Sequence, residues 1–514
     1  MGAALMRASF SANIKERRDF SCALFDGHGR MLAQAANLPV HLGSQPMSVA
    51  AAIEAVDMRP GIHVILNDPY AGGTHLPDIT LVSPVYLPGH ESGRPAFYVS
   101  NRAHHADIGG KSPGSMPSPR NASGDVEPLT IDDEGWRCAP TILDDAVRDS
   151  LCAASRTPDE RLGDLRAQEA ANIVGARRLI EMVEAMGPEA LEARNEAVLA
   201  YSERRMRAVI AALPDGDYRF EDALDDDGTD DRPVPIPVTL RIAGDSARVD
   251  FSQAPDSVPG AVNAVRAIAV AAVAYVFRCL GGADVPANEG LMRPIEVITR
   301  EGSLCDARAP AAVSAGNVET SQRLVDVLYG ALAQAAPDRI PAASGGTMNN
   351  VLFGGTDTRP GPRQGTPYVH YETLACGAGG SAVGPGASAI QTHMTNTLNT
   401  PIEELERLFP VRITRYALRP SPPTAEPDDT PGGAGVVRAY TFLADTDVTL
   451  ISDRRRLAPW GLGGAAGGQP GRNLLRRTDG TESALPGKVQ LSVSSGDTVV
   501  VETPSGGGWR PARS

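Results

Sequence analysis

In the first 150 residues, short runs of apolar residues alternate with turns that contain glycine and proline. Their alternation with polar positions predicts strands, and Asp26-Gly27 between the first two runs is typical of a tight hairpin turn. One intervening segment has helical character instead. The strands are expected at residues 20–25, 31–35, 62–66, 79–87 and 96–100, and the helix at 47–56.

A helical pattern replaces the strands from about Pro158. Apolar residues recur at helical spacing until Gly187-Pro188 and then again until Pro214, which predicts a helical hairpin. Strands return over 217–251, around an acidic segment at 221–231 that does not fit an EF-hand calcium loop and is expected to be a solvated hairpin loop. Two further helices are expected at 259–280 and 318–335.

The last third of the chain, from Ser344, is rich in glycine and mostly strand-like. A short helix is expected near 401–408, and 420–435 has the Pro, Asp and Gly content of an exposed loop. The whole pattern predicts an α+β fold: a large mixed body of Gly-rich antiparallel sheets and a helical hairpin, with interlocked domains. Its expected parts are an N-terminal α/β region at 1–150, the helical hairpin at 151–215, a central α+β region at 216–420 and a mostly β region at 421–514.

Composition and charge narrow the class of protein. The 514 residues exceed what one hydrophobic core holds, and 42% apolar with 21% charged residues is an ordinary globular balance. The formal charge of −14 argues against nucleic acid or an anionic membrane as a partner. The most apolar stretch, 267–277, is about half the ~20 residues of a membrane span. Six dispersed cysteines without a CxxC pair, and no signal-peptide pattern, predict a reduced, cytoplasmic protein.

Two neighbouring segments concentrate the candidate chemistry, and each holds histidine and aspartate: Asn67–Asp78 and Asn101–Asp107. If the strands between them form a hairpin, paired residue numbers sum to about 181. His75 and Asp78 then lie opposite positions 103–106. Only one of His104 and His105 can point into the shared site, because adjacent strand residues face opposite ways.

Two imidazoles and one carboxylate, with coordination positions left free, suit a catalytic zinc, manganese or iron(II) ion. Buried histidine and aspartate must be paired, so a core built from them without a ligand is costly. The alternative is a hydrogen-bonded turn with solvated histidines, started by Asp68-Pro69. The sequence leaves both interpretations open.

Three partial matches to motifs of nucleotide-binding or hydrolase sites are incomplete. A P-loop would need a glycine where His105 stands, and Gly377–Ala382 lacks the following helix that a dinucleotide fingerprint requires. Gly110–Gly114 matches a nucleophile elbow in letters, but prolines follow its serine where a helix is needed. We therefore expect no ATP site on this chain.

Long motifs that span nearly the whole chain carry a resemblance. They are Ser11–Ser21, His41–Ser44, Asn67–Asp78, Arg102–Asp107 with Pro113–Met116, Gly163–Gln168, Asn317–Thr320, Gly346–Asn350, Tyr371–Thr373 and His393–Thr397. Together they resemble the hydantoinase B/oxoprolinase family. The chain departs from the family pattern at Pro431–Val437 and at its start, where members usually carry a further helical stretch. The start codon is then misassigned or a docking helix is missing.

The resemblance implies a function. Members of this family work with, or are fused to, a hydantoinase A-type subunit that binds ATP, and they open 5-oxoproline, N-methylhydantoin and related lactams; relatives carboxylate acetone or acetophenone. ATP phosphorylates an amide or enol oxygen, and in the hydrolases water attack is completed at a metal on the B-type subunit. Carried over to this sequence, the ligands of one divalent metal are His75, Asp78 and His104, with Asp19 as a fourth candidate. His105 then turns towards Asp107 or the substrate.

Glu372 and His393 flank a glycine-dense loop, where the backbone can approach a ligand closely. With His105 they are the candidate catalytic residues, and the alternative for Glu372 and His393 is a structural pair that braces the loop. The expected function is the B-type subunit of an ATP-dependent ring-opening hydrolase for a small cyclic amide, with ATP on the partner. A ketone carboxylase subunit and a non-catalytic scaffold for the A-type subunit are the alternatives. Ring substrate, metal identity and stoichiometry stay open.

Overall fold

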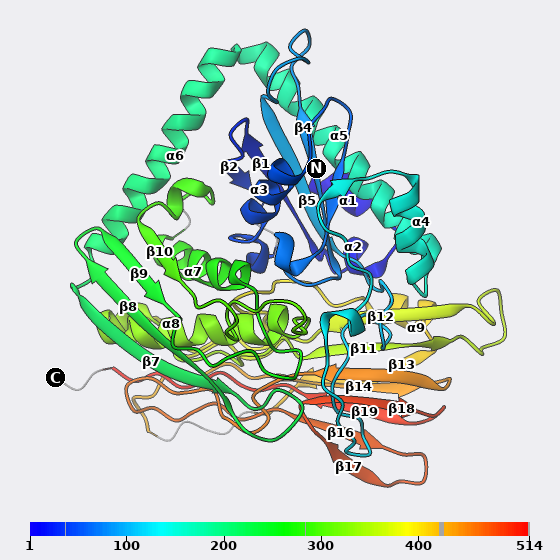
Figure 1. Ribbon diagram of the computed structural model, residues 1–514. Helices are drawn as coiled ribbons and strands as arrows, with labels where there is room; N and C mark the ends of the chain where they lie inside the picture. The colour runs from blue at the N-terminus through cyan, green and yellow to red at the C-terminus, as the bar shows by residue number, and fades with distance from the viewer. Residues whose placement is uncertain (36–37, 283, 421–425, 512–514) are drawn as a thin grey trace.

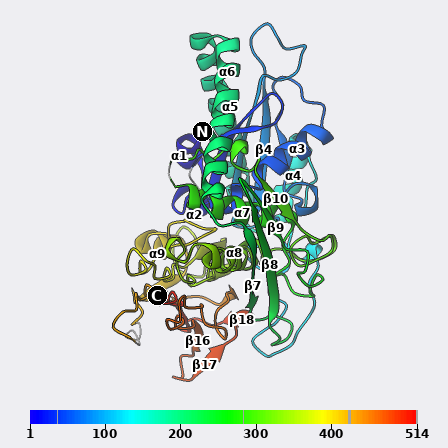
Figure 2. The same ribbon diagram turned by 90° about the vertical axis from the view of Figure 1, so that its left-hand side faces the viewer.

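The computed structural model describes residues 1–514 except 36–37, 283, 421–425 and 512–514. The described residues form four sheets and a long helical hairpin (Figure 1). The N-terminal sheet and the helical hairpin occupy the upper part of the molecule, and the two C-terminal sheets lie below them (Figure 2). This is the α+β body of sheets and a helical hairpin that the sequence predicts; the strand pairing is antiparallel apart from one parallel pair in the second sheet of the described residues.

The N-terminal sheet has six antiparallel strands in the order β2-β1-β5-β4-β3-β6. Successive residues of β5 face opposite sides: Tyr98 packs in the apolar cluster under helix α3 (Gln45–Ala55), and Val99 packs towards helix α5. The predicted hairpin at Asp26-Gly27 is confirmed. The strands are β1 (Phe20–Asp26), β2 (Met31–Gln34), β3 (Val64–Leu66), β4 (Asp78–Val85), β5 (Phe97–His104) and β6 (Thr141–Ile142).

The helical hairpin consists of α5 (Pro158–Met186) and α6 (Pro188–Ala211). Gly187 joins them at φ +80°, a value that glycine adopts without a Cβ penalty, and Pro188 starts α6 with its φ already helical. α5 lies on β4 and β5 and is preceded by α4 (Asp145–Ala154). The short helix α1 (Gly2–Ala8) packs beside α5, and α2 (Ala12–Lys15) packs on α1 and β5. The predicted hairpin is thereby confirmed.

A second sheet, with order β10-β9-β8-β7, packs on helices α7 and α8. The predicted helix at 259–280 is shorter at its start, because the Asn263 side-chain amide donates to the carbonyls of Val258, Gly260 and Ala312 and holds that stretch in a turn. A π-helix, η5 (Gly316–Thr320), leads directly into α8. The elements are β7 (Gly216–Leu224), β8 (Val234–Ala243), β9 (Ser246–Asp250), α7 (Arg266–Gly281), β10 (Ile295–Ile298) and α8 (Ser321–Ala335).

The acidic segment at 221–231 is partly buried, so the expectation of a solvated hairpin loop is wrong. Asp222 lies 3.1 Å from Arg323 of α8, and Arg323 also reaches Asp453, 3.0 Å away. Lys488 completes the network at 2.9 Å from Asp453. Removing one partner from such a buried network is strongly destabilising, since it leaves the other charge uncompensated.

Two C-terminal sheets, β12-β11-β15-β18 and β13-β14-β19-β16-β17, face each other across a shared apolar cluster that contains Phe353, Tyr440 and Leu491. The short helix α9 (Ile402–Leu408) was expected, and the expected loop at 420–435 falls partly outside the described residues. The strands are β11 (Asn350–Thr356), β12 (Pro367–Thr373), β13 (Val411–Leu418), β14 (Val436–Phe442), β15 (Thr446–Ile451), β16 (Arg472–Arg476), β17 (Glu482–Leu485), β18 (Lys488–Val493) and β19 (Thr498–Glu502).

One apolar cluster connects the N-terminal sheet, the second sheet, α7 and α8. Strands from both sides of residue 420 also share sheets, as β11 does with β15. The domain boundaries at 150, 215 and 420 stay predictions. In the part of the chain that the structure describes, no helix has the length and apolar character needed to cross a membrane.

Candidate metal centre

The loop before β4 folds back so that His75 comes beside Asp78. Gly72 adopts φ +95°, and Gly73 packs so closely that a Cβ would lie 2.6 Å from the Asn67 carbonyl oxygen. The Asn67 amide closes the loop by donating to the Leu76 carbonyl, 2.7 Å away. The His75 side chain therefore returns to the end of the sheet.

Strand pairing brings His104 to the same place. Asp78, the first residue of β4, is the register partner of His104, the last residue of β5. Paired residue numbers along this hairpin sum to 78 + 104 = 182, one more than the sequence predicts. The convergence predicted from the hairpin is confirmed to within one residue.

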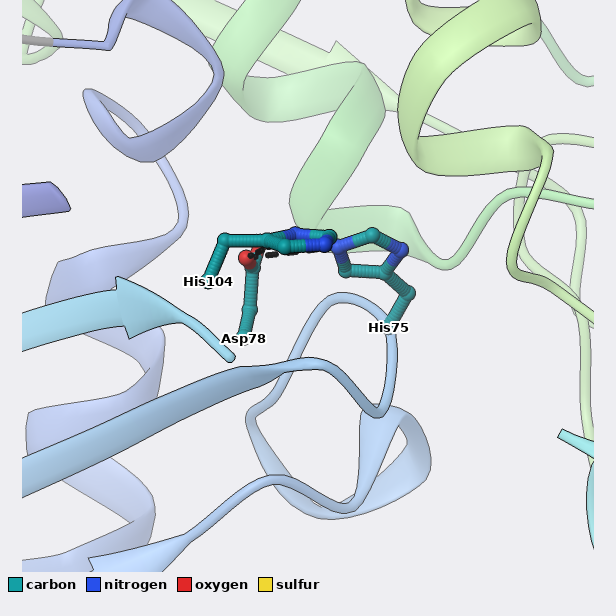
Figure 3. Close-up of side chains that lie close together, drawn as sticks. All are labelled: His75, Asp78 and His104. Atoms are coloured by element: carbon teal, nitrogen blue, oxygen red, sulfur yellow. Dashed lines mark ion pairs between the residues drawn. The ribbon is translucent and has the colours of Figure 1, made fainter. Parts of the chain in front are cut away.

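Three side chains meet around one carboxylate oxygen (Figure 3). His75 Nε2 lies 3.2 Å and His104 Nδ1 lies 3.3 Å from Oδ1 of Asp78. One donor atom from each residue lies within 4.8 Å of the other two, and all three side chains are buried. This group can hold a metal ion.

The contacts of His75 explain why a cation fits the group. Its Nδ1 lies 3.3 Å from the Ser314 carbonyl oxygen, which can only accept, so Nδ1–H donates there. The other ring nitrogen, Nε2, faces Oδ1 of Asp78. Neither His75 Nε2 nor His104 Nε2 has a hydrogen-bond partner among the described residues. A cation between these acceptors satisfies them, and the contact to Ser314 is of the kind that fixes the ring of a metal-ligating histidine.

The other carboxylate oxygen of Asp78, Oδ2, is held by three side chains. Burial alone would raise the pKa of Asp78, but its contacts with the surrounding histidines hold that pKa well below its ordinary value. Asp78 therefore stays ionised. The atoms that hold Oδ2 are Thr74 Oγ1 at 3.0 Å, His41 Nε2 at 3.2 Å and Asn317 Nδ2 at 3.4 Å.

Asp19 lies close to this group without joining it. Its backbone carbonyl accepts from the His104 N–H, and its carboxylate lies 3.6 Å from Arg17. Burial raises the pKa of Asp19, and His104 and Arg17 oppose that shift. Among the described residues, only His75, Asp78 and His104 bring ligand atoms within 4.8 Å of one another, so Asp19 as a fourth ligand stays a proposal.

Tyr371 of β12 forms one wall of the group. Its ring stacks on His104 with 4.5 Å between centroids, and the Arg17 guanidinium lies 4.5 Å from the same ring. The Tyr371 hydroxyl donates to Asn350 Oδ1. Because neighbouring strand residues face opposite sides, Glu372 points away, towards Arg438 at 3.3 Å and Tyr440 at 2.6 Å.

His105 and His393, the other two candidate catalytic residues, also lie apart from the group. His105 faces α5, where its Nε2 lies 2.9 Å from Gln168 Oε1, and burial lowers its pKa to about 4. His393 pairs with Asp326 at 3.1 Å, so Glu372 and His393 do not brace the loop as a pair with each other. The catalytic roles of His105, Glu372 and His393 stay predictions.

Sequence reasoning missed four residues of the site: His41, Thr74, Asn317 and Tyr371. All four lie in motifs that carried the family resemblance, which was the one available signal. The contacts of His41, Asn317 and Tyr371 join distant segments, and 239 residues separate Asp78 from Asn317. Thr74 is only four residues from Asp78, but the turn that brings them together is set by the fold. Local periodicity cannot show such contacts.

Comparison with known proteins places the chain. The family described as hydantoinase B/oxoprolinase matches residues 1–511. A protein of Methanocaldococcus jannaschii is 36% identical over 99% of this chain and 87% of its own length. The B-type subunit of a putative D-/L-hydantoinase from a Pseudomonas species is 31% identical over the same shares, 99% and 87%. 5-Oxoprolinase 1 of Arabidopsis thaliana is 34% identical over 99% of this chain, which spans 40% of that protein.

Two solved structures have a similar fold. The ATP-dependent caprolactamase of Pseudomonas jessenii superposes with a TM-score of 0.86 at 26% identity, covering 99% of this chain and 88% of that one. An acetone carboxylase structure superposes with a TM-score of 0.83 at 16% identity, over 99% of this chain and 73% of that one, and shows the shared fold alone. The motifs, the fold and these matches lead to one conclusion: the chain belongs to the hydantoinase B/oxoprolinase family.

Proposed function

We propose that this chain is the B-type subunit of an ATP-dependent hydrolase that opens hydantoin, 5-oxoproline or a similar lactam. The observation that carries the proposal is the buried group of His75, Asp78 and His104, in which unpartnered imidazole nitrogens surround a carboxylate. Three relatives are named for cyclic amides: a 5-oxoprolinase, a hydantoinase subunit and a caprolactamase. We propose that a substrate of this class reacts at the group of His75, Asp78 and His104.

One divalent metal, zinc, manganese or iron, is proposed on His75, Asp78 and His104, with Asp19 as a fourth ligand. Such an ion polarises a carbonyl and lowers the pKa of its bound water towards ~7. The chain's own residues prepare the site: the Ser314 carbonyl orients His75, and His41 and Thr74 hold the second oxygen of Asp78. Burial keeps bulk water away, so a reactive phosphorylated intermediate is protected from side reactions.

The partner in this proposal is an ATP-binding, hydantoinase A-type subunit. This chain carries no P-loop in its sequence, and it spans only 40% of 5-oxoprolinase 1. A relative that is named as one subunit of a hydantoinase supports a complex of separate chains. We propose two copies of each subunit, in the cytoplasm, with the ring substrate binding on this chain.

The test is co-purification with the A-type subunit followed by an assay of hydantoin and 5-oxoproline opening with and without ATP. We expect one mixed complex by light scattering, ATP-dependent ring opening by the complex, and no ATP hydrolysis by this chain alone. ATP hydrolysis by the single chain, or two proteins that elute separately, would contradict the proposal.

The two alternatives predict different results in the same preparation. A ketone carboxylase subunit would support bicarbonate-dependent ATP turnover with acetone, whereas the hydrolase opens a ring without bicarbonate. A scaffold need not hold stoichiometric metal, so metal analysis of the purified chain tests that alternative. The acetone carboxylase likeness does not favour the first alternative, since at 16% identity it extends to the fold only.

A further inference from the structure

Asn317 presents an unused hydrogen-bond acceptor beside the candidate metal centre. Its side-chain Nδ2 lies 3.4 Å from Oδ2 of Asp78, and a carboxylate oxygen only accepts, so the amide is oriented with Nδ2 towards Asp78. The other atom of the amide, Oδ1, is buried and has no hydrogen-bond partner among the described residues. The residue itself is 5% exposed.

The backbone fixes this orientation. Asn317 is the second residue of the π-helix η5, and π-turns occur frequently at functional sites. Gly316 before it packs against the Asn263 backbone, where a Cβ would lie 1.8 Å from the carbonyl oxygen. Only glycine fits there, so the turn cannot shift to bury Oδ1 elsewhere.

An unpartnered buried acceptor destabilises the fold, and a metal on the three ligands does not require this one. Asn317 Oδ1 therefore needs a donor that the described part of the chain does not provide. Glu319 on the same turn also has a free oxygen, Oε2, but Glu319 is held through Oε1 by the Met348 N–H and the Asn350 amide instead of contacting Asp78. Asn317 is the residue of the turn that contacts the ligand carboxylate.

We propose that Asn317 Oδ1 accepts a hydrogen bond from the ring N–H of a cyclic amide substrate, and so selects lactams and hydantoins. This inference rests on the proposed function and specifies its substrate class. A lactam, a hydantoin and 5-oxoproline all carry a ring N–H beside the carbonyl. A lactone or a ketone offers only oxygen lone pairs or C–H groups at that position. Asn317 therefore favours amide opening over a ketone reaction at the same centre.

The test compares two five-membered rings that differ at one position, 2-pyrrolidinone with N–H and γ-butyrolactone with oxygen. Equilibrium titration of each into the metal-loaded full chain gives a ratio of dissociation constants. We expect the wild type to prefer 2-pyrrolidinone by at least about tenfold, as one hydrogen bond predicts. In Asn317→Leu, which removes the acceptor, the ratio should fall to about one.

Thr74→Val is the matched control. Thr74 also donates to Oδ2 of Asp78, at 3.0 Å, so its loss weakens the same support without removing the free acceptor. Thr74→Val should keep the wild-type ratio. The inference is overturned if the wild type shows no preference, if Asn317→Leu keeps the wild-type ratio, or if Thr74→Val loses it as well.

Metal content separates the remaining explanations. Loss of metal from Asn317→Leu, with the metal retained in Thr74→Val, would assign the amide oxygen to the metal, which also overturns the inference. The proposed function is judged separately, by metal content and ATP-dependent ring opening of the wild-type complex. A complex that opens lactams while Asn317→Leu keeps the ratio refutes the role of Asn317 alone.

Discussion

His41 Nε2 lies 3.2 Å from Oδ2 of Asp78, although 37 residues separate the two along the chain. The opposite nitrogen of the imidazole, Nδ1, lies 2.9 Å from the Ser21 hydroxyl of β1. Burial lowers the pKa of His41, so the ring is neutral near pH 7 and Nε2–H donates to the carboxylate. His41 thus orients Asp78 from outside the group of candidate ligands.

Replacing His41 should weaken metal binding without removing a ligand. Partners that orient metal ligands are typically worth about 10–100-fold in metal affinity, and we expect that loss for His41→Ala. Chelator competition measures it. His63→Ala is the control, because His63 also bonds a serine hydroxyl, that of Ser83 at 2.6 Å, but does not contact Asp78. An unchanged affinity in His41→Ala would contradict the orienting role.

Removal of a ligand should abolish metal binding. Each of His75→Ala, Asp78→Ala and His104→Ala is expected to lose the metal, measured by mass spectrometry on the purified full chain, and to lose ring opening with the partner. His105→Ala is the matched control, since its ring faces Gln168 on the other side of β5. Metal retained in His104→Ala and lost in His105→Ala would mean that the facing assignment is wrong by one residue.

Glu372→Gln tests whether this residue serves the reaction or the fold. Glu372 faces the fully buried Arg438 at 3.3 Å, so the variant leaves that charge without its partner. We expect destabilisation of about 3 kcal/mol in urea unfolding, with metal content unchanged. Adding Arg438→Met should restore most of the stability. Unchanged stability with a lower turnover per folded molecule would instead support the catalytic role predicted from the sequence.

Glu134→Gln should change how stability depends on pH. Burial raises the pKa of Glu134 from 4.5 to about 8, so folding favours its protonated form. That contribution is complete below pH 4.5 and is lost as the pH rises through about 8. Gln keeps an acceptor oxygen for the N–H groups of Val313 and Ser314, which Glu134 Oε1 holds at 2.7 and 2.8 Å, and it does not ionise.

Between about pH 5 and about pH 9, the free energy of unfolding of the variant should therefore exceed that of the wild type by roughly a few kcal/mol. Urea midpoints across that range measure the gain. Glu189→Gln, on an exposed carboxyl at the start of α6, is the control and should follow the wild type. A difference between Glu134→Gln and the wild type that stays constant with pH would contradict the assignment.

Features that depend on neighbouring residues could be predicted before the fold was known. Asp26-Gly27 specifies the β1–β2 turn, and Gly187-Pro188 specifies the break between α5 and α6, because φ preferences act locally. The meeting of Asp78 with His104 also followed from sequence, since the register of one hairpin is set by its own strands. The family followed from the length and spread of the motifs.

The surroundings of these features depend on contacts between segments far apart in the chain. Asp222 looked like part of a solvated loop, yet it pairs with Arg323 across 101 residues of chain. Ser314 and Asn317 reach His75 and Asp78 from 239 residues away, and Asn317 does so from a π-turn that no periodicity predicts. Such contacts depend on how separate elements pack, and packing satisfies buried charges and amides with whatever partner lies near in space, at any distance along the chain.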